Sequence, residues 1–388
     1  MAPTTDVTVH GRVDPAFEAV RDAFAANFTE RDDIGAACCV YVGGRPVVDV
    51  WGGVADVVSG ARWCDDTIVL VFSTTKGVTA TVANLLVERG ELDLDAPVAE
   101  YWPEFAAGGK GAVPVRWLLS HQAGLPLVEG DFTLDDVGAW HPLVDALAAQ
   151  APLWEPGTAH GYHMRTYGWL VGEVVRRANG HTVGELVASE LAAPLGLDLW
   201  VGLPEEHEPR CAGVVAPRGE NGALLDAMRS LPPDEYLIAR VAPNPSDLFA
   251  YDERWNRREL RAAEMPSSNG VADARSLARL YAALVGEVDG VRLLAPETVA
   301  RAATPEASGP DRVLMIDTAY GLGFMLPPTV APGAGPSAFG HAGAGGSLAF
   351  ADRDAGMTFA YVMNDLRFLA DEDRRTGALV DAVYGALR

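Results

Sequence analysis

Ser73 and Lys76 are the two residues whose types and spacing most directly suggest chemistry. On a helix, a spacing of three residues places both side chains on one face, so the amine of Lys76 can reach the hydroxyl of Ser73. A serine hydroxyl becomes a nucleophile when a neighbouring base takes its proton. Lysine can be that base where burial lowers its pKa, and apolar neighbours such as Leu70 and Val78 predict burial. The alternative is a helix-capping serine beside a solvated lysine.

Two other segments could complete a site around this pair. Tyr162 lies in the segment 155–164, whose glycines predict a loop from which the phenol can project into a cleft. Segment 340–346, Gly-His-Ala-Gly-Ala-Gly-Gly, directly precedes a predicted strand. Its small residues would let a substrate approach the strand edge closely.

The elements that must position these residues follow from hydrophobic periodicity. Apolar residues at helical spacing predict a helix over 15–31, and two β-rich runs, 36–42 and 46–51, predict a hairpin. A short apolar strand at 68–72 leads into a helix that begins near Ser73 and ends at a glycine. Ser73 would then lie at the positive end of the helix, which favours negative charge on its oxygen.

Helices dominate the middle of the chain and strands return near its end. The predicted helices cover 115–120, 135–150, 166–178, 183–191 and 273–285, and the predicted strands cover 347–352 and 357–363, before a closing helix at 371–387. This order predicts an α+β fold, in which an antiparallel sheet is built from both chain ends and flanked by the terminal helices.

The same order predicts one catalytic unit made of two lobes. We expect an α/β lobe over approximately 1–75 and 270–388, and a mainly helical lobe over approximately 76–269. Proline-rich links within 203–269 are expected to form lid-like loops over the site.

Composition excludes several classes of function. The chain has 388 residues, of which 49% are hydrophobic, and a formal net charge of −23, so it is a globular protein that repels nucleic acid and anionic membranes. The four cysteines show no metal-ligand spacing, and Cys38 and Cys39 lie in a predicted buried strand, so we expect neither a metal nor another cofactor. No apolar stretch has the length of a signal peptide or a membrane span, which predicts a cytoplasmic protein. Oligomeric state has no signal in the sequence.

Together the three motifs resemble those of the serine β-lactamase and penicillin-binding protein superfamily, in the same order and over nearly the whole chain. The chain is most similar to the family VIII carboxylesterases, which resemble class C β-lactamases in fold but usually cleave esters. This resemblance implies that Ser73 is the nucleophile, Lys76 its base or base partner, and Tyr162 a proton relay that is anionic or shares a proton with Lys76. It also implies an oxyanion hole formed by the backbone N–H groups of Ser73 and Ala344.

Two positions depart from the class C pattern. The third position of the tyrosine motif is Met164, where those enzymes have an asparagine that holds the antibiotic's amide. The later motif begins with His341, where they have a lysine that helps to hold the antibiotic's carboxylate. These departures disfavour an anionic lactam as the main substrate. The resulting candidates for contacting substrate are His341, Gly343, Met164 and His163.

The leading hypothesis is a serine hydrolase that cleaves small-molecule carboxylic esters of small to medium acyl chain through an acyl-enzyme. An amide or peptide hydrolase or an acyltransferase, of the weak β-lactamase or D-aminopeptidase type, is the alternative on the same scaffold. A non-catalytic penicillin-recognising binding protein is a further alternative. A Ser/His/Asp hydrolase is disfavoured because the sequence contains no GxSxG motif, although His121, His160 and His163 are available.

Overall fold

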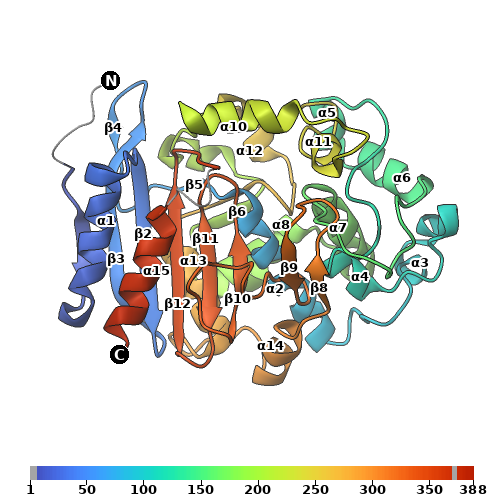
Figure 1. The fold of residues 1–388 in the computed structure, drawn as a ribbon. Helices are drawn as coiled ribbons and strands as arrows, with labels where there is room; N and C mark the ends of the chain where they lie inside the picture. Colours follow the sequence, from blue (N-terminus) through green and yellow to red (C-terminus); the bar gives the residue numbers. More distant parts are fainter. Residues whose placement is uncertain (1–6, 369–373) are drawn as a thin grey trace.

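The main sheet joins strands from the two ends of the chain. The computed structural model describes residues 7–368 and 374–388, and the sheet has the order β1-β3-β2-β12-β11-β10, with β4 paired to β3 (Figure 1). All of its strand pairs are antiparallel. The strands are β1 (His10–Val13), β2 (Gly35–Val42), β3 (Arg45–Asp56), β4 (Ala61–Arg62), β10 (Ala338–Ala342), β11 (Leu348–Asp352) and β12 (Met357–Met363).

The central pairing explains the composition of the strands. β2 pairs with β12 in a register that sets Val42 opposite Met357 and Ala36 opposite Met363. Both strands are almost entirely buried, so they read as continuous apolar runs, and Cys38 and Cys39 are fully buried in β2. The predicted α+β fold, with its sheet built from both chain ends, is confirmed.

Helices cover both faces of this sheet. α1 (Glu18–Glu30) and α15 (Arg374–Ala386) pack against each other on one face, and α13 (Ala274–Val285) packs on β2, β11 and β12 from the other (Figure 1). Asp273 caps α13, because its carboxylate accepts a hydrogen bond from Ser276 N at 2.7 Å. The sheet is therefore enclosed between two helical layers.

The residues between the two halves of the sheet form the helical lobe. Its helices are α2 (Thr75–Glu88), α3 (Val98–Tyr101), α4 (Val115–Leu119), α5 (Leu134–Ala139), α6 (His141–Ala149), α7 (Thr166–Asn179), α8 (Val183–Leu186), α9 (Ala193–Leu195), α10 (Glu220–Arg229), α11 (Leu237–Val241) and α12 (Arg258–Ala262). A small sheet of β5 (Val69–Leu70), β7 (Gly270–Ala272) and β6 (Leu199–Val201) connects this lobe to the rest. Outside the lobe, α14 (Pro296–Ala302) precedes the hairpin of β8 (Ala307–Pro310) and β9 (Asp317–Tyr320).

Several elements differ from those predicted. The helix expected over 135–150 is two helices, because Trp140 has φ +67° and interrupts the chain between α5 and α6. The strand expected at 68–72 is shorter and pairs with β7 in the small sheet. β10 was not predicted, and it contains His341. The closing helix is described from Arg374, so its predicted start at 371–373 lies outside the described residues. None of the described helices has both the length and the apolar composition needed to cross a lipid bilayer.

Candidate active site

Ser73 lies at the junction between β5 and α2, within the 3₁₀ turn Phe72–Thr74. The residue before it, Phe72, has φ +46°, a left-handed conformation that is strained for a bulky side chain. The surroundings hold it in place: Val71 N donates to Gly270 O at 2.8 Å, Thr75 Oγ1 donates to Phe72 O, and the Phe72 ring packs edge-on against Trp255. These contacts hold Phe72 in its strained conformation and so fix Ser73 at the start of the helix.

The amine of Lys76 lies beside the hydroxyl of Ser73. Its Nζ lies 3.2 Å from Ser73 Oγ and donates to the carbonyls of Met164 at 2.7 Å and Ser267 at 2.9 Å. The side chain is fully buried, and this burial, helped by the charge of Arg165, holds the pKa of Lys76 well below its usual range. A neutral amine has two N–H donors and one lone pair. Because the two carbonyls engage the donors, the lone pair is left facing the Ser73 hydroxyl.

Tyr162 lines the same cavity as Ser73, and the Ser73 side chain is one of the groups that influence the Tyr162 phenol. Its backbone N–H donates to Asp311 Oδ1 at 3.1 Å, and its ring stacks on Tyr320 at 6.2 Å. Burial raises the pKa of Tyr162, so the phenol keeps its proton at neutral pH. Lys76 Nζ lies over the ring face, 4.8 Å from its centroid. The burial of Tyr162 therefore favours the neutral phenol over the anionic form considered from the sequence.

The turn after β10 presents backbone donors beside Ser73. The N–H groups of Ser73 and Ala344 have no backbone acceptor among the described residues, which leaves both available to a developing oxyanion. Gly343 must be glycine here, because a Cβ would lie 2.4 Å from Val71 O and 2.1 Å from Ser347 Oγ. Ser347 Oγ in turn donates to Val71 O at 2.7 Å, so the turn is tied to the segment that carries Ser73.

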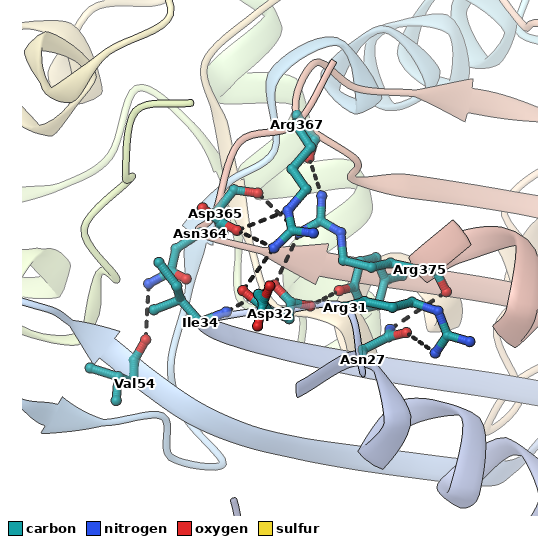
Figure 2. A network of polar contacts seen from close by, with 12 residues as sticks. Asn27, Arg31, Asp32, Ile34, Val54, Asn364, Asp365, Arg367 and Arg375 are labelled. Carbon is teal, nitrogen blue, oxygen red and sulfur yellow. Dashed lines mark hydrogen bonds and ion pairs between the residues drawn. The ribbon is translucent and has the colours of Figure 1, made fainter. Parts of the chain in front are cut away.

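A polar network that includes Arg375, Arg367 and Asp365 (Figure 2) is bonded to this turn through Gly345 O. Arg375 on α15 donates to Gly345 O at 2.9 Å and to Asp365 O at 3.0 Å, and it forms an ion pair with Asp33. The backbone N–H of Arg367 also donates to Gly345 O, at 3.2 Å. The network thus links the C-terminal helix to the residue that follows Ala344.

A cavity of about 270 Å³ opens beside Ser73. Asp247 is the one charged side chain among the described residues that line it, and neither lysine nor arginine contributes. The remaining lining is mostly apolar and includes the predicted substrate contacts Gly343 and Met164, together with Ile238, Ala239, Ala242, Pro243, Ala250, Tyr251, Leu314, Met325, Ala342, Ala344 and Phe368. Much of one wall comes from the segment 203–269. The cavity therefore suits an uncharged, largely apolar group attached to a reacting carbonyl.

The two predicted histidine contacts do not line this cavity. His163 is fully buried, its Nε2 accepts from Leu125 N at 2.9 Å, and its Nδ1 lies 2.7 Å from Gly161 O. His341 is fully buried behind Tyr162, and its Nδ1 lies 2.7 Å from Ala342 O. Burial lowers the pKa of His163 to about 4 and that of His341 to about 3, so both rings are neutral. Neither histidine is among the described residues that line the cavity, and their contact with a substrate stays a prediction.

Sequence reasoning missed two residues that shape the site. Asp311 is buried and accepts from the backbone N–H groups of Tyr162, Val313 and Leu314, which fixes the loop that carries Tyr162. Arg165 is buried beside Lys76, and its guanidinium donates to four backbone carbonyls between Val241 and Phe249, in a segment that lines the cavity. Nothing in the local sequence distinguishes either residue from a solvated charge. The described residues contain no group of three or more His, Cys, Asp or Glu side chains that could hold a metal ion.

Comparisons with known proteins find relatives that match nearly the whole chain. The family model described as Beta-lactamase matches residues 23–384. "Esterase/beta-lactamase LipL" of Mycobacterium tuberculosis is 39% identical over 373 residues, which cover 94% of this chain and 85% of that protein. A crystal structure of a family VIII carboxylesterase superposes with a TM-score of 0.86 at 38% identity, covering 98% of this chain and all of the other. A penicillin-binding protein homologue from Caulobacter crescentus gives a TM-score of 0.86 at 37% identity, with the same coverage.

Proposed function

This chain belongs to the Beta-lactamase family, and from that premise we propose that it is a carboxylesterase that cleaves esters of small to medium acyl chain. The observation that carries the proposal is the position of Lys76 Nζ, bound to two carbonyls and 3.2 Å from the Oγ of Ser73, a residue that lines an apolar cavity. Esterase-named and carboxylesterase relatives support the choice of substrate class.

In the first half of the reaction, the neutral amine of Lys76 takes the proton of Ser73 as Ser73 Oγ attacks the ester carbonyl. The N–H groups of Ser73 and Ala344 stabilise the tetrahedral oxyanion, and each such donor is typically worth about 3 kcal/mol. The tetrahedral intermediate collapses when the C–O bond to the alcohol breaks. Tyr162 gives its proton to the departing oxygen and is reprotonated by the ammonium of Lys76.

In the second half, water hydrolyses the acyl-enzyme. The amine of Lys76, again neutral, takes a proton from the water as the water attacks the acyl carbonyl. The bond to Ser73 Oγ breaks, the proton returns to Ser73, and the carboxylic acid leaves. The cavity holds the acyl or alcohol group by burying its apolar surface.

The described cavity lining contains neither lysine nor arginine, and this supports an ester substrate. An anionic lactam would place a carboxylate in a cavity whose one charged lining residue is Asp247, with neither lysine nor arginine among the described lining residues. A neutral ester meets no such repulsion and requires no asparagine at the position of Met164. Ester hydrolysis is therefore favoured over lactam hydrolysis.

The test is turnover of p-nitrophenyl esters from acetate to octanoate, measured beside nitrocefin and a D-amino-acid amide. We expect a burst of nitrophenol equal to the enzyme concentration, and a loss of at least about 10³-fold in kcat for Ser73→Ala. The matched control is Ser189→Ala, an exposed serine on the surface of the helical lobe, which should keep full activity. Undiminished turnover in Ser73→Ala would overturn the proposal, and faster turnover of the amide than of any ester would replace it with amide hydrolysis.

A further inference from the structure

Arg165 is a buried cation without a carboxylate partner among the described residues. Arg165 follows Tyr162 by three positions in the sequence, and 4% of its surface is exposed. The guanidinium donates to the carbonyls of Val241 at 3.4 Å, Ala242 at 2.7 Å, Asn244 at 3.2 Å and Phe249 at 2.8 Å. Such burial is costly for a charge, and backbone carbonyls alone compensate it only in part.

The four carbonyls belong to one irregular segment, residues 241–251, which we refer to as the cavity wall. It supplies Ala242, Pro243, Asp247, Ala250 and Tyr251 to the lining of the cavity. Ser246 and Asp247 have positive φ values, so the backbone here follows neither a helix nor a strand and its carbonyls need other donors. The planar fork of an arginine can satisfy several such carbonyls at once, which a lysine cannot.

The backbone on either side of Arg165 is bonded to the groups that hold Lys76. Met164 O, one residue before Arg165, accepts from Lys76 Nζ at 2.7 Å. Arg165 O accepts from Ser267 Oγ at 2.8 Å, and Ser267 O accepts from Lys76 Nζ at 2.9 Å. The backbone of Arg165 is therefore bonded to the same short stretch of structure that binds the amine.

The charge of Arg165 acts on Lys76 in surroundings that otherwise carry little charge. The rings of Tyr162 and Tyr167 face the amine from α7 and the loop before it. Burial lowers the pKa values of the three nearby imidazoles, so they are neutral: His121, His163 and His341. The Asp311 carboxylate accepts hydrogen bonds from the backbone N–H groups of Tyr162 and Val313. Asp247 and Tyr251 interact electrostatically with Arg165. Burial lowers the pKa of Lys76 most, and the positive charge of Arg165 lowers it further.

We propose that Arg165 is a positioning residue with two roles: its fork holds the cavity wall in shape, and it places a fixed positive charge beside the segment that binds the amine of Lys76. The inference rests on the proposed function, because it takes Ser73 and Lys76 as the nucleophile and its base. Because one side chain serves both roles, a change at Arg165 should alter the shape of the cavity and the basicity of Lys76 together.

The experiment separates charge from shape with three variants. Arg165→Lys keeps the charge but loses the fork, Arg165→Met loses both, and Arg165→Gln loses the charge but keeps an N–H₂ donor. The readout is phosphonylation of Ser73 by an alkyl fluorophosphonate, measured as kinact and KI across pH, which does not depend on any ester being the natural substrate. Arg261→Met is the matched control, because Arg261 is a buried arginine of the same lobe that is paired with Glu208.

We expect the acid limb of kinact/KI to move to higher pH by about one unit in Arg165→Met and Arg165→Gln, because Lys76 protonates more easily once the nearby charge is gone. In Arg165→Lys the limb should stay in place while KI rises by about tenfold, and in Arg261→Met neither should change. An unmoved limb in folded Arg165→Met or Arg165→Gln overturns the electrostatic role. An unchanged KI in Arg165→Lys overturns the structural role, and this charge-retaining variant provides the test if the neutral ones do not fold.

The two proposals fail in different ways. If wild-type Ser73 is phosphonylated but no ester is turned over, the ester substrate is wrong and the roles of Arg165 are still decided by the pH profile. If wild-type Ser73 is not phosphonylated at all, the nucleophile itself is wrong and both proposals fall.

Discussion

Arg375 and Asp33 form an ion pair at 3.0 Å in which both side chains are completely buried. Asp33 follows the first long helix and Arg375 lies on the last one, so the pair joins the two ends of the chain. The same guanidinium donates to Gly345 O, next to the Ala344 N–H that we propose for the oxyanion hole. The Arg375 side chain therefore contributes both to the stability of the fold and to the position of the turn that carries Ala344.

Replacing Arg375 by methionine should lower the free energy of unfolding by about 3–5 kcal/mol, because it leaves the Asp33 carboxylate buried without its partner. Chemical denaturation measures this loss. The double variant Asp33→Ala with Arg375→Met should lose less than the sum of the two single variants. As a control, Arg21→Met removes a surface pair with Glu18 and should cost less than about 1 kcal/mol. An additive double variant would contradict the pairing.

The pH dependence of turnover should show an acid limb and no alkaline limb below about pH 10. Lys76 must be unprotonated to act as base, and because its pKa lies well below its usual range, kcat/KM should fall as the pH drops and the amine gains a proton. The pKa of Tyr162 is raised, so the phenol retains its proton throughout the range. A profile of ester hydrolysis from pH 4 to 10 measures this. Activity that rose only toward pH 10 would show that Lys76 titrates normally.

Gly343→Ala should abolish most turnover. Its Cβ would lie within 2.4 Å of Val71 O, so the turn that carries Ala344 must move away from Ser73. Loss of one oxyanion donor costs about 10²–10³-fold in kcat, which stopped-flow or steady-state kinetics can detect. Gly377→Ala is the control: this helix glycine has open space around a Cβ, so the change should leave kcat intact and stabilise α15 slightly. Equal kcat in the two variants would argue against the turn's role.

Asp247→Lys should improve the hydrolysis of anionic esters relative to neutral ones. Asp247 is exposed and is the one charged residue among the described lining of the cavity. A single charge close to the ligand in water is worth about 1 kcal/mol, so changing its sign shifts the interaction by about 2 kcal/mol and should raise the ratio of kcat/KM for p-nitrophenyl hemisuccinate over p-nitrophenyl butyrate by up to about 30-fold. Asp22→Lys makes the same change in net charge on α1, away from the cavity. Equal ratios in the two variants would show that net charge alone controls the preference.

The parts of the site that could be predicted are those fixed by local spacing. Ser73 and Lys76 are three residues apart at a strand-to-helix junction, and Gly343 lies in a run of small residues, so their proximity follows from short stretches of sequence. The antiparallel sheet built from both ends follows from apolar strands near each end with helices between. These features need no knowledge of long-range packing.

The histidines and Arg165 could not be predicted for the opposite reason. His163 is held by Leu125 N from a distant loop, and burial makes its ring neutral; neither fact is visible in the residues around it. Arg165 looks like a solvated charge until the carbonyls of the cavity wall, some 80 residues later in the chain, surround it. Its role depends on tertiary contacts, which composition and periodicity do not encode.

The pairing of β2 with β12 also constrains how the protein is made. Residues 36–42 cannot complete the centre of the sheet until residues 357–363 have left the ribosome, about 300 residues later. At 5–20 residues per second, this apolar strand waits for roughly 15–60 s with one edge unpaired. Nascent chains are therefore exposed to aggregation through this edge for most of their synthesis, and a chain that ends before β12 cannot close the sheet at all.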